Sequence, residues 1–238
     1  MNMHNKKILV IGGSSGIGKA VAEMAYSMGN HVTLTSRQLP KAIATAKSIG
    51  NTVTGLQLDI NDETQVEIFF NAIEGFDHIY IAAGSTKIGA LTDGLLHQNL
   101  QAFHTRLIGS LSVVRAAIHR ISSGGSFVFT GGISTDRPIP GAWVSGLGTA
   151  AAEQLARVLV MEYPYIRFNA VSPGYTDTPM WDDLLGENRN TILAEVAQKL
   201  PVKKIASPQE VASAVLFLMS NASVNGEVLH VDGGGRLV

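Results

Sequence analysis

A glycine-rich turn between a strand and a helix is the feature of this sequence that most restricts its fold. The apolar run Lys7–Ile11 predicts a buried strand, and the apolar spacing over Ile17–Met28 predicts the helix that follows. Gly12 permits a tight turn, Gly16 lets backbone N–H groups approach an anion, and Gly18 lets helix and strand pack closely. The helix start adds unpaired donors and a positive dipole end. The pattern predicts a phosphate site, with a ligand-free turn as the alternative. The residues of this site are Gly12, Ser14, Ser15, Gly16, Ile17 and Gly18.

Short strand patterns alternate with longer helix patterns along the rest of the chain. The expected strands are His31–Thr35, Thr52–Leu58, His78–Ala82, Phe127–Thr130, Ile166–Val171 and Val228–Val231. The expected helices are Lys41–Ile49, Glu63–Ile73, Leu95–Ile121, Val144–Met161 and Gln209–Met219. Such alternation predicts an α/β fold in which helices cover both faces of a doubly wound parallel sheet. Ligands of these sheets bind outside the carboxyl ends of the strands.

Composition narrows the class of protein further. The 238 residues contain no long linker or repeat, so we expect a single dinucleotide-binding domain over residues 1–238. With 18 basic and 19 acidic residues, the chain lacks the basic excess of a nucleic-acid binder. The absence of cysteine excludes disulfides and thiolate metal sites, and no other metal-ligand cluster is evident. The apolar run Ile8–Ile11 is too short for a signal peptide or a membrane span, so we expect a cytoplasmic protein with no membrane partner.

The end of the second strand indicates which dinucleotide the turn prefers. NAD-binding folds place a carboxylate there for the ribose 2′-hydroxyl, but this sequence has Thr35-Ser36-Arg37 and no acid. The Arg37 guanidinium suits a 2′-phosphate, and Ser36 can add a hydroxyl. The alternative is a solvated surface arginine. We therefore predict NADP(H) as the cofactor.

Several motifs, in the same order along the chain, resemble the short-chain dehydrogenase/reductase family. Besides the glycine turn, they are Leu58–Asp62, Ala82–Gly84, Ile166–Gly174 and the segment from Gly226 to Gly234. In that family the aspartate and its neighbour hold the adenine, and the Pro-Gly region flanks the nicotinamide. The resemblance therefore adds cofactor residues to the turn and to Ser36 and Arg37. They are Asp59, Ile60, Ala82, Ala83, Gly84, Pro173, Gly174, Thr176 and Thr178.

The resemblance also implies an architecture and an assembly. It implies a Rossmann-type sheet of about seven parallel strands, and a homodimer or homotetramer built on the two long helices. The alternative is that those helices meet only the sheet. Residues 178–201 would form a lid over the substrate. Its apolar side chains would form a cover, or dock as ordinary core residues; they are Met180, Trp181, Leu184 and Leu185.

The sequence departs from the family at the positions expected to carry the chemistry. Family members use a tyrosine and a lysine, spaced Tyr-x-x-x-Lys, with a serine and an asparagine. Aligned on Ala150–Leu155, the lysine position holds Thr149 and the tyrosine position holds Ser145. The serine position holds Gly132, and the asparagine position holds Arg106. No Tyr-x-x-x-Lys occurs anywhere in the chain, so the sequence assigns no residue to the family's usual catalytic roles.

A few other residues are weak catalytic candidates. Arg106 could stabilise an enolate or anchor an anionic substrate, and Tyr175 follows the Pro-Gly pair. His104 is more simply a packed or solvated histidine. The expected substrate loop adds residues that could equally be solvated; they are Ser134, Asp136, Arg137 and Trp143.

Two hypotheses about function follow from an intact cofactor site beside an altered catalytic one. The first is an atypical NADPH-dependent oxidoreductase acting on an activated carbonyl, enone or quinone, whose reduction needs little acid catalysis. The second is a non-catalytic NADP(H)-binding sensor or regulatory oligomer. We favour the first, while a scaffold without cofactor fits poorly with Gly16, Arg37 and Asp59.

Overall fold

The structure, a computed structural model, describes residues 3–84 and 88–238. Within these residues a seven-stranded sheet has the order β3-β2-β1-β4-β5-β6-β7, and all neighbouring strands are parallel. The strands are β1 Lys7–Ile11, β2 His31–Ser36, β3 Thr54–Gln57, β4 Phe76–Ile81, β5 Ile121–Thr130, β6 Arg167–Pro173 and β7 Val228–Val231. This arrangement confirms the predicted Rossmann-type fold.

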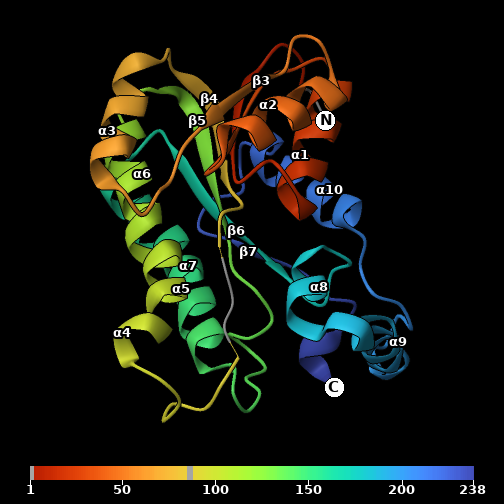
Figure 1. The fold of residues 1–238 in the computed structure, drawn as a ribbon. Helices are drawn as coiled ribbons and strands as arrows, with labels where there is room; N and C mark the ends of the chain where they lie inside the picture. The colour runs from red at the N-terminus through yellow and green to blue at the C-terminus, as the bar shows by residue number, and fades with distance from the viewer. Residues whose placement is uncertain (1–2, 85–87) are drawn as a thin grey trace.

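Helices cover both faces of the sheet (Figure 1). One face packs on α3 (Glu63–Ala72), α6 (Ser110–Ala117) and α7 (Trp143–Glu162). The other packs on α1 (Gly16–Ser27), α2 (Leu39–Ile49) and α10 (Pro208–Ser220). Because side chains alternate along a strand, successive residues of β1 enter the two cores in turn. In the described part of the chain, no helix combines the length and apolar character needed to cross a membrane.

The strand order reverses between β1 and β4, and this reversal positions the site. The backbone N–H groups of Ala82 and Ala83, just beyond β4, both donate to the carbonyl oxygen of Ile11, at 2.9 and 3.1 Å. The glycine turn after β1 therefore lies against the segment that follows β4. Doubly wound sheets bind ligands at such a switch point.

The predicted helix Leu95–Ile121 is wrong as a single element. The structure has α4 (Leu96–Asn99), α5 (Gln101–His104), a π-helical turn η1 (Thr105–Gly109) and then α6. Contacts with Ile60 and Asn61 explain part of the interruption: a Cβ on Gly109 would lie 2.8 Å from Ile60, and the Thr105 hydroxyl donates to Asn61 Oδ1 at 2.8 Å. Ile121 continues the apolar spacing but pairs with Phe76 in the sheet. The spacing of apolar residues does not reveal such tertiary contacts.

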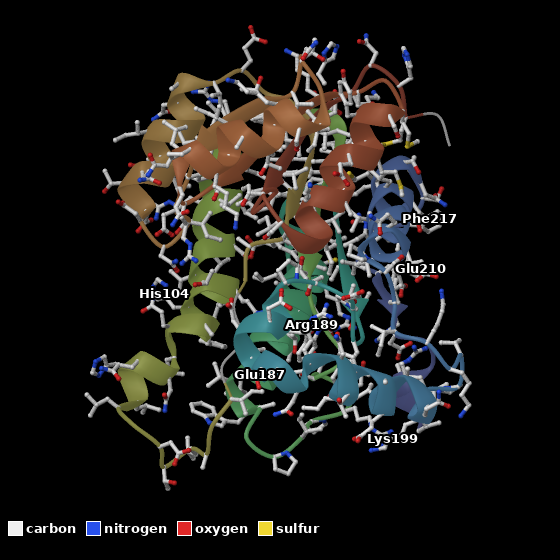
Figure 2. All side chains as sticks on the ribbon, turned by 45° about the vertical axis from the view of Figure 1, so that its right-hand side comes forward. His104, Glu187, Arg189, Lys199, Glu210 and Phe217 are labelled. Atoms are coloured by element: carbon white, nitrogen blue, oxygen red, sulfur yellow. The ribbon has the colours of Figure 1, made fainter. Side chains whose placement is uncertain are left out.

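The segment after β6 folds into helices that the sequence analysis did not predict. They are α8 (Met180–Leu185), the short turn η2 (Gly186–Asn188) and α9 (Arg189–Lys199). They lie beside the C-terminal turn η3 (Gly235–Leu237), at the end of the molecule away from the N-terminus (Figure 1). Arg189, near the centre of Figure 2, forms ion pairs with Asp177 and Asp182 and so ties the start of α9 to α8.

Candidate functional site

A cavity of about 1250 Å³ opens at the carboxyl ends of the strands. Its wall includes every residue that the sequence predicts to bind the cofactor. These are Gly12, Ser14, Ser15, Gly16, Ile17, Gly18, Ser36, Arg37, Asp59, Ile60, Ala82, Ala83, Gly84, Pro173, Gly174, Thr176 and Thr178. Segments far apart in the sequence therefore form one site, large enough for an extended ligand.

The glycine turn has a shape that only glycine allows. Gly12 and Gly16 have φ angles of +81° and +51°, in the left-handed region that other residues rarely adopt. A Cβ on Gly18 would lie 2.3 Å from the carbonyl oxygen of Gly12, and one on Gly12 would lie 2.9 Å from the Ala83 nitrogen. Side chains at these two positions would clash with the backbone of the turn itself and of the segment after β4. The turn thus fits a dinucleotide pyrophosphate, which needs close backbone approach.

The end of the cavity beside β2 carries positive charge. Ser36 and exposed Arg37 line the wall there. Lys41, in the first turn of α2, joins them, and the sequence analysis missed it. Its position four residues after Arg37, at the start of a helix, is a signal that could have identified it. We call the part formed by Gly12–Gly18, Ser36, Arg37 and Lys41 the glycine-turn end.

The positions assigned to the family's catalytic groups meet at the other end of the same cavity. Arg106, Gly132, Ser145 and Thr149 all line it, and we call this part the tetrad end. Ser145 and Thr149 lie one turn apart on α7 and are buried. The Thr149 hydroxyl donates to the Ser145 carbonyl at 2.9 Å and accepts from Thr135 at 2.9 Å. The hydroxyl of Thr149 is therefore engaged in the protein's own hydrogen bonds.

Arg106 extends from the π-helical turn into this end. Its Nη1 donates to the carbonyl oxygen of Thr130 at 2.8 Å, and its Nε is buried with no partner among the described residues. Burial lowers the pKa of its guanidinium, while the nearby Tyr80 and Glu153 oppose that shift. Arginine nevertheless stays protonated in proteins. The tetrad end therefore holds a permanent cation.

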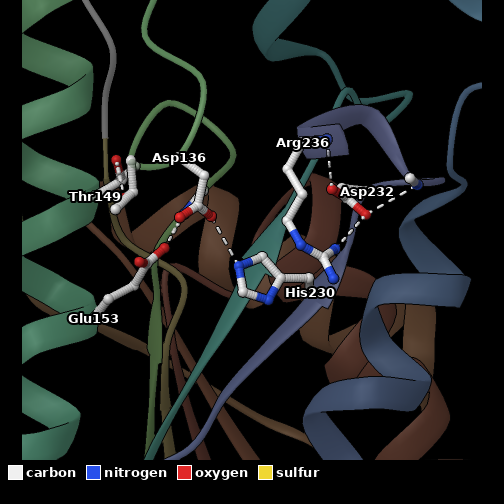
Figure 3. A network of polar contacts seen from close by, with 9 residues as sticks. Asp136, Thr149, Glu153, His230, Asp232 and Arg236 are labelled. Atoms are coloured by element: carbon white, nitrogen blue, oxygen red, sulfur yellow. Dashed lines mark hydrogen bonds and ion pairs between the residues drawn. The ribbon is translucent and has the colours of Figure 1, made fainter. Parts of the chain in front are cut away.

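A buried polar cluster supports this end from behind. Glu153, 3% exposed, accepts a hydrogen bond from the Gly132 backbone nitrogen at 3.1 Å, and α7 carries it one turn beyond Thr149 (Figure 3). The Tyr80 phenol lies 3.0 Å from the Thr130 hydroxyl, and burial raises its pKa to about 12. The sequence analysis missed both residues, although a lone carboxylate on an alanine-rich helix face was a signal for Glu153.

The weaker catalytic candidates divide into two groups. Tyr175 lines the cavity and stacks on Trp181, with ring centroids 5.2 Å apart. Ser134 and Arg137 also line it. The remaining three candidates do not line the cavity. Asp136 pairs with His230 at 2.9 Å (Figure 3), His104 lies on α5 at the outer side of the molecule (Figure 2), and Trp143 starts α7.

Apolar side chains from residues 178–201, the segment expected to form a lid, line part of the cavity. None of the residues of α8 is buried in the core, yet Met180, Trp181, Leu184 and Leu185 line the cavity. Their alternative role as ordinary core residues is thus excluded. Further apolar residues complete this wall; they are Ile88, Ile133, Ile139, Ile192, Val196 and Leu200.

Comparisons with known proteins agree with this fold. A family model described as enoyl-(acyl carrier protein) reductase matches residues 12–235. The chain is 32% identical over 240 residues to carbonyl reductase family member 4 of Danio rerio, covering 97% of this chain and 98% of that protein.

Two solved structures extend the comparison. One, described as a short chain dehydrogenase/reductase family protein, has a TM-score of 0.91 at 32% identity and full coverage of both chains. Another, a small-chain dehydrogenase in complex with NADPH, has a TM-score of 0.87 at 30% identity, covering 98% of this chain and 100% of that one. The doubly wound sheet and these relatives together define the class of protein, which is a dinucleotide-binding oxidoreductase of Rossmann-type fold. The chain belongs to the short-chain dehydrogenase/reductase family.

Proposed function

We propose that this protein is an atypical NADPH-dependent reductase whose substrate is an activated carbonyl, an enone or a quinone. One observation carries the proposal: a single cavity joins the glycine turn, a basic end beside β2 and an apolar lid. A dinucleotide can lie along such a cavity with its phosphates at the turn. The apolar lid then leaves room for a second, uncharged ligand.

NADPH is proposed over NADH because of the charge at the glycine-turn end. Arg37 and Lys41 both line the cavity where the second strand ends. A guanidinium and an ammonium bind a charged 2′-phosphate much more strongly than a neutral 2′-hydroxyl. The related small-chain dehydrogenase that was solved with NADPH is consistent with this choice.

We further propose that the family's usual proton-donating groups are absent from this member. The tetrad end carries Ser145, Thr149, Gly132 and Arg106 at the aligned positions. An aliphatic hydroxyl is a much weaker acid than the phenol of tyrosine, and each well-placed acid–base group contributes about 10² to 10⁴ in rate. An acceptor that tolerates delayed protonation is therefore the natural substrate.

The protein's own residues would bind, orient and shield the reactants. The glycine turn and Arg37 would hold the nucleotide, and the lid side chains would exclude water from the acceptor. When bound, NADPH supplies the hydride. Arg137, on the cavity wall and bonded to the Gly235 carbonyl at 3.4 Å, would help to hold the substrate loop in place.

A second candidate is a non-catalytic NADP(H)-binding sensor or regulatory oligomer. Apolar side chains exposed on η1, α6 and α7 favour it, because a second copy could cover them. They are Ile108, Leu111, Leu147, Val158 and Met161. Under either function, we also propose that the protein forms a homodimer or homotetramer and lies in the cytoplasm.

The test is NADPH oxidation, followed by absorbance, across a panel of ketones, enones and quinones. We expect turnover with enones or quinones, and its loss in a Gly16→Asp variant purified identically. NADPH binding is measured in parallel by calorimetry. Tight NADPH binding without turnover on any panel member would favour the sensor, and no binding would remove both functions.

A further inference from the structure

The guanidinium of Arg106 has an incomplete set of partners. Its Nη1 donates a hydrogen bond to the Thr130 carbonyl oxygen, and among residues 3–84 and 88–238 no acid forms an ion pair with it. Glu153 affects its charge only from a distance. Arg106 is half-buried on the cavity wall and, among the described residues, has no acid within ion-pair distance, so a ligand oxygen in the cavity can complete its hydrogen bonds.

Two glycines make room for this side chain. A Cβ on Gly84 would lie 2.9 Å from Arg106 Cζ, and a Cβ on Gly148 would lie 2.9 Å from Arg106 Cδ. Arg106 itself stands in a π-helical turn, a distortion often found at functional sites. The helix distortion and the two close approaches thus hold the cation in one place, beside Thr149 and Ser145 on the same wall.

We propose that Arg106 is a catalytic residue that binds the substrate oxygen on which negative charge develops, and that the substrate is an uncharged α,β-unsaturated carbonyl or quinone. This inference rests on the proposed NADPH-dependent reduction. At the tetrad end, the group that stabilises the developing negative charge is then a side chain of η1 and not one of α7. A fixed cation in a water-poor site stabilises developing charge strongly.

The charge balance of the reaction explains this choice of substrate. The acceptor gains one hydrogen and two electrons from the reduced cofactor, which leaves as NADP⁺. With an enone, a new C–H bond forms at the β carbon, the π electrons move onto the carbonyl oxygen, and an enolate results. With a quinone, the hydride forms an O–H bond at one oxygen, and the other oxygen carries the negative charge of the hydroquinone anion. That oxygen accepts hydrogen bonds from Arg106 and later takes a proton from water. No protein acid is consumed in these steps.

The same cation disfavours other acceptors. An iminium substrate would bring a second positive charge beside Arg106, which costs energy in a medium of low polarity. An ordinary ketone would form a localised alkoxide, which needs a proton immediately and finds no phenol at Ser145. The apolar lid wall, with Trp181 and Met180, fits an uncharged ring or chain.

The experiment measures the ionisation of a chromophoric phenol, 4-nitrophenol, bound to the NADPH-saturated protein and to the nucleotide-free protein. Its phenolate resembles the oxyanion of the proposed product. We expect binding to lower the pKa of the phenol by about one unit. Arg106→Met should abolish this shift, and Arg106→Lys should retain part of it.

Two further variants separate charge from structure. Gly148→Ala keeps the guanidinium but displaces it; since alanine favours a helix, α7 should keep its stability while the phenol shift shrinks. Lys47→Met removes an exposed cation of α2 that is not on the cavity wall and should leave the shift unchanged. An unshifted or unbound phenol with the wild-type protein would overturn the proposal, as would an equal shift in Arg106→Met. NADPH affinity, measured on the same samples, reports separately on the proposed function.

Discussion

The two ends of the cavity differ in how their residues are constrained. At the glycine-turn end, Gly12 and Gly16 have positive φ angles, and a Cβ on Gly12 or Gly18 would lie less than 3.0 Å from a neighbouring backbone atom, so these positions require glycine. At the tetrad end, small residues stand at Gly132, Ser145 and Thr149, and the hydroxyl of Thr149 is engaged within the protein.

This difference separates binding from chemistry. A nucleotide site depends on backbone shape, which Gly12, Gly16 and Gly18 set locally. A proton-transfer site depends on side-chain identity, which single substitutions change without disturbing the sheet. A member of this family can therefore keep its cofactor site while its reaction changes.

The largest expected effect comes from rebuilding the tetrad end. Combining Arg106→Asn, Gly132→Ser, Ser145→Tyr and Thr149→Lys should raise the rate of simple ketone reduction by about 10² to 10⁴-fold, because it supplies the phenol that we propose this protein lacks. Steady-state NADPH oxidation measures the gain. The matched control replaces Ser145 by Phe instead of Tyr and should show no gain. A folded, NADPH-binding quadruple variant that stays inactive would contradict the alignment of these positions.

Gly16→Asp should have the next largest effect, at the opposite end. A carboxylate would place like charge against the pyrophosphate and force an aspartate into a φ of +51°, so NADPH affinity should fall roughly 100-fold or more. Calorimetry measures the loss. Gly124→Asp, at a φ of +80° with nothing within 4 Å of its Cβ, is the control and should bind normally. Unchanged affinity in Gly16→Asp would place the phosphates elsewhere.

Arg37→Asp should change which cofactor is preferred. Loss of the 2′-phosphate partner should weaken NADPH about 10- to 100-fold, while NADH should bind as well as before or better, because the new carboxylate can accept a hydrogen bond from the ribose 2′-hydroxyl. Arg115→Asp, which breaks an exposed pair with Glu63 outside the cavity, is the control. Equal losses for both nucleotides would remove the specificity assigned to Arg37.

Lys41→Met should have the smallest effect. Lys41 is exposed, so its charge is partly screened, and we expect NADPH affinity to fall roughly two- to fivefold. Lys47→Met, in the last turn of the same helix, should leave affinity unchanged. If the two variants behave alike, the glycine-turn end relies on Arg37 alone.

What the sequence could predict depends on how local each constraint is. The glycine turn and Arg37 follow from short patterns, and every predicted cofactor residue lines the cavity. The place of Arg106 depends on Gly84 and Gly148, which are distant in sequence, and on a π-helical turn that apolar spacing does not reveal. The helices α8 and α9 were missed for a related reason: α8 buries no residue in the core and α9 only Leu193, so their apolar pattern is weak.

The most direct test of the account is a calorimetric titration of the wild-type protein with NADPH, NADP⁺, NADH and NAD⁺. We expect the two phosphorylated forms to bind most tightly, and NADPH to bind better than NADP⁺, because Arg106 disfavours a second positive charge at the tetrad end. Equal affinity for NADH and NADPH would contradict the role of Arg37. Absence of binding by all four nucleotides would contradict the account as a whole.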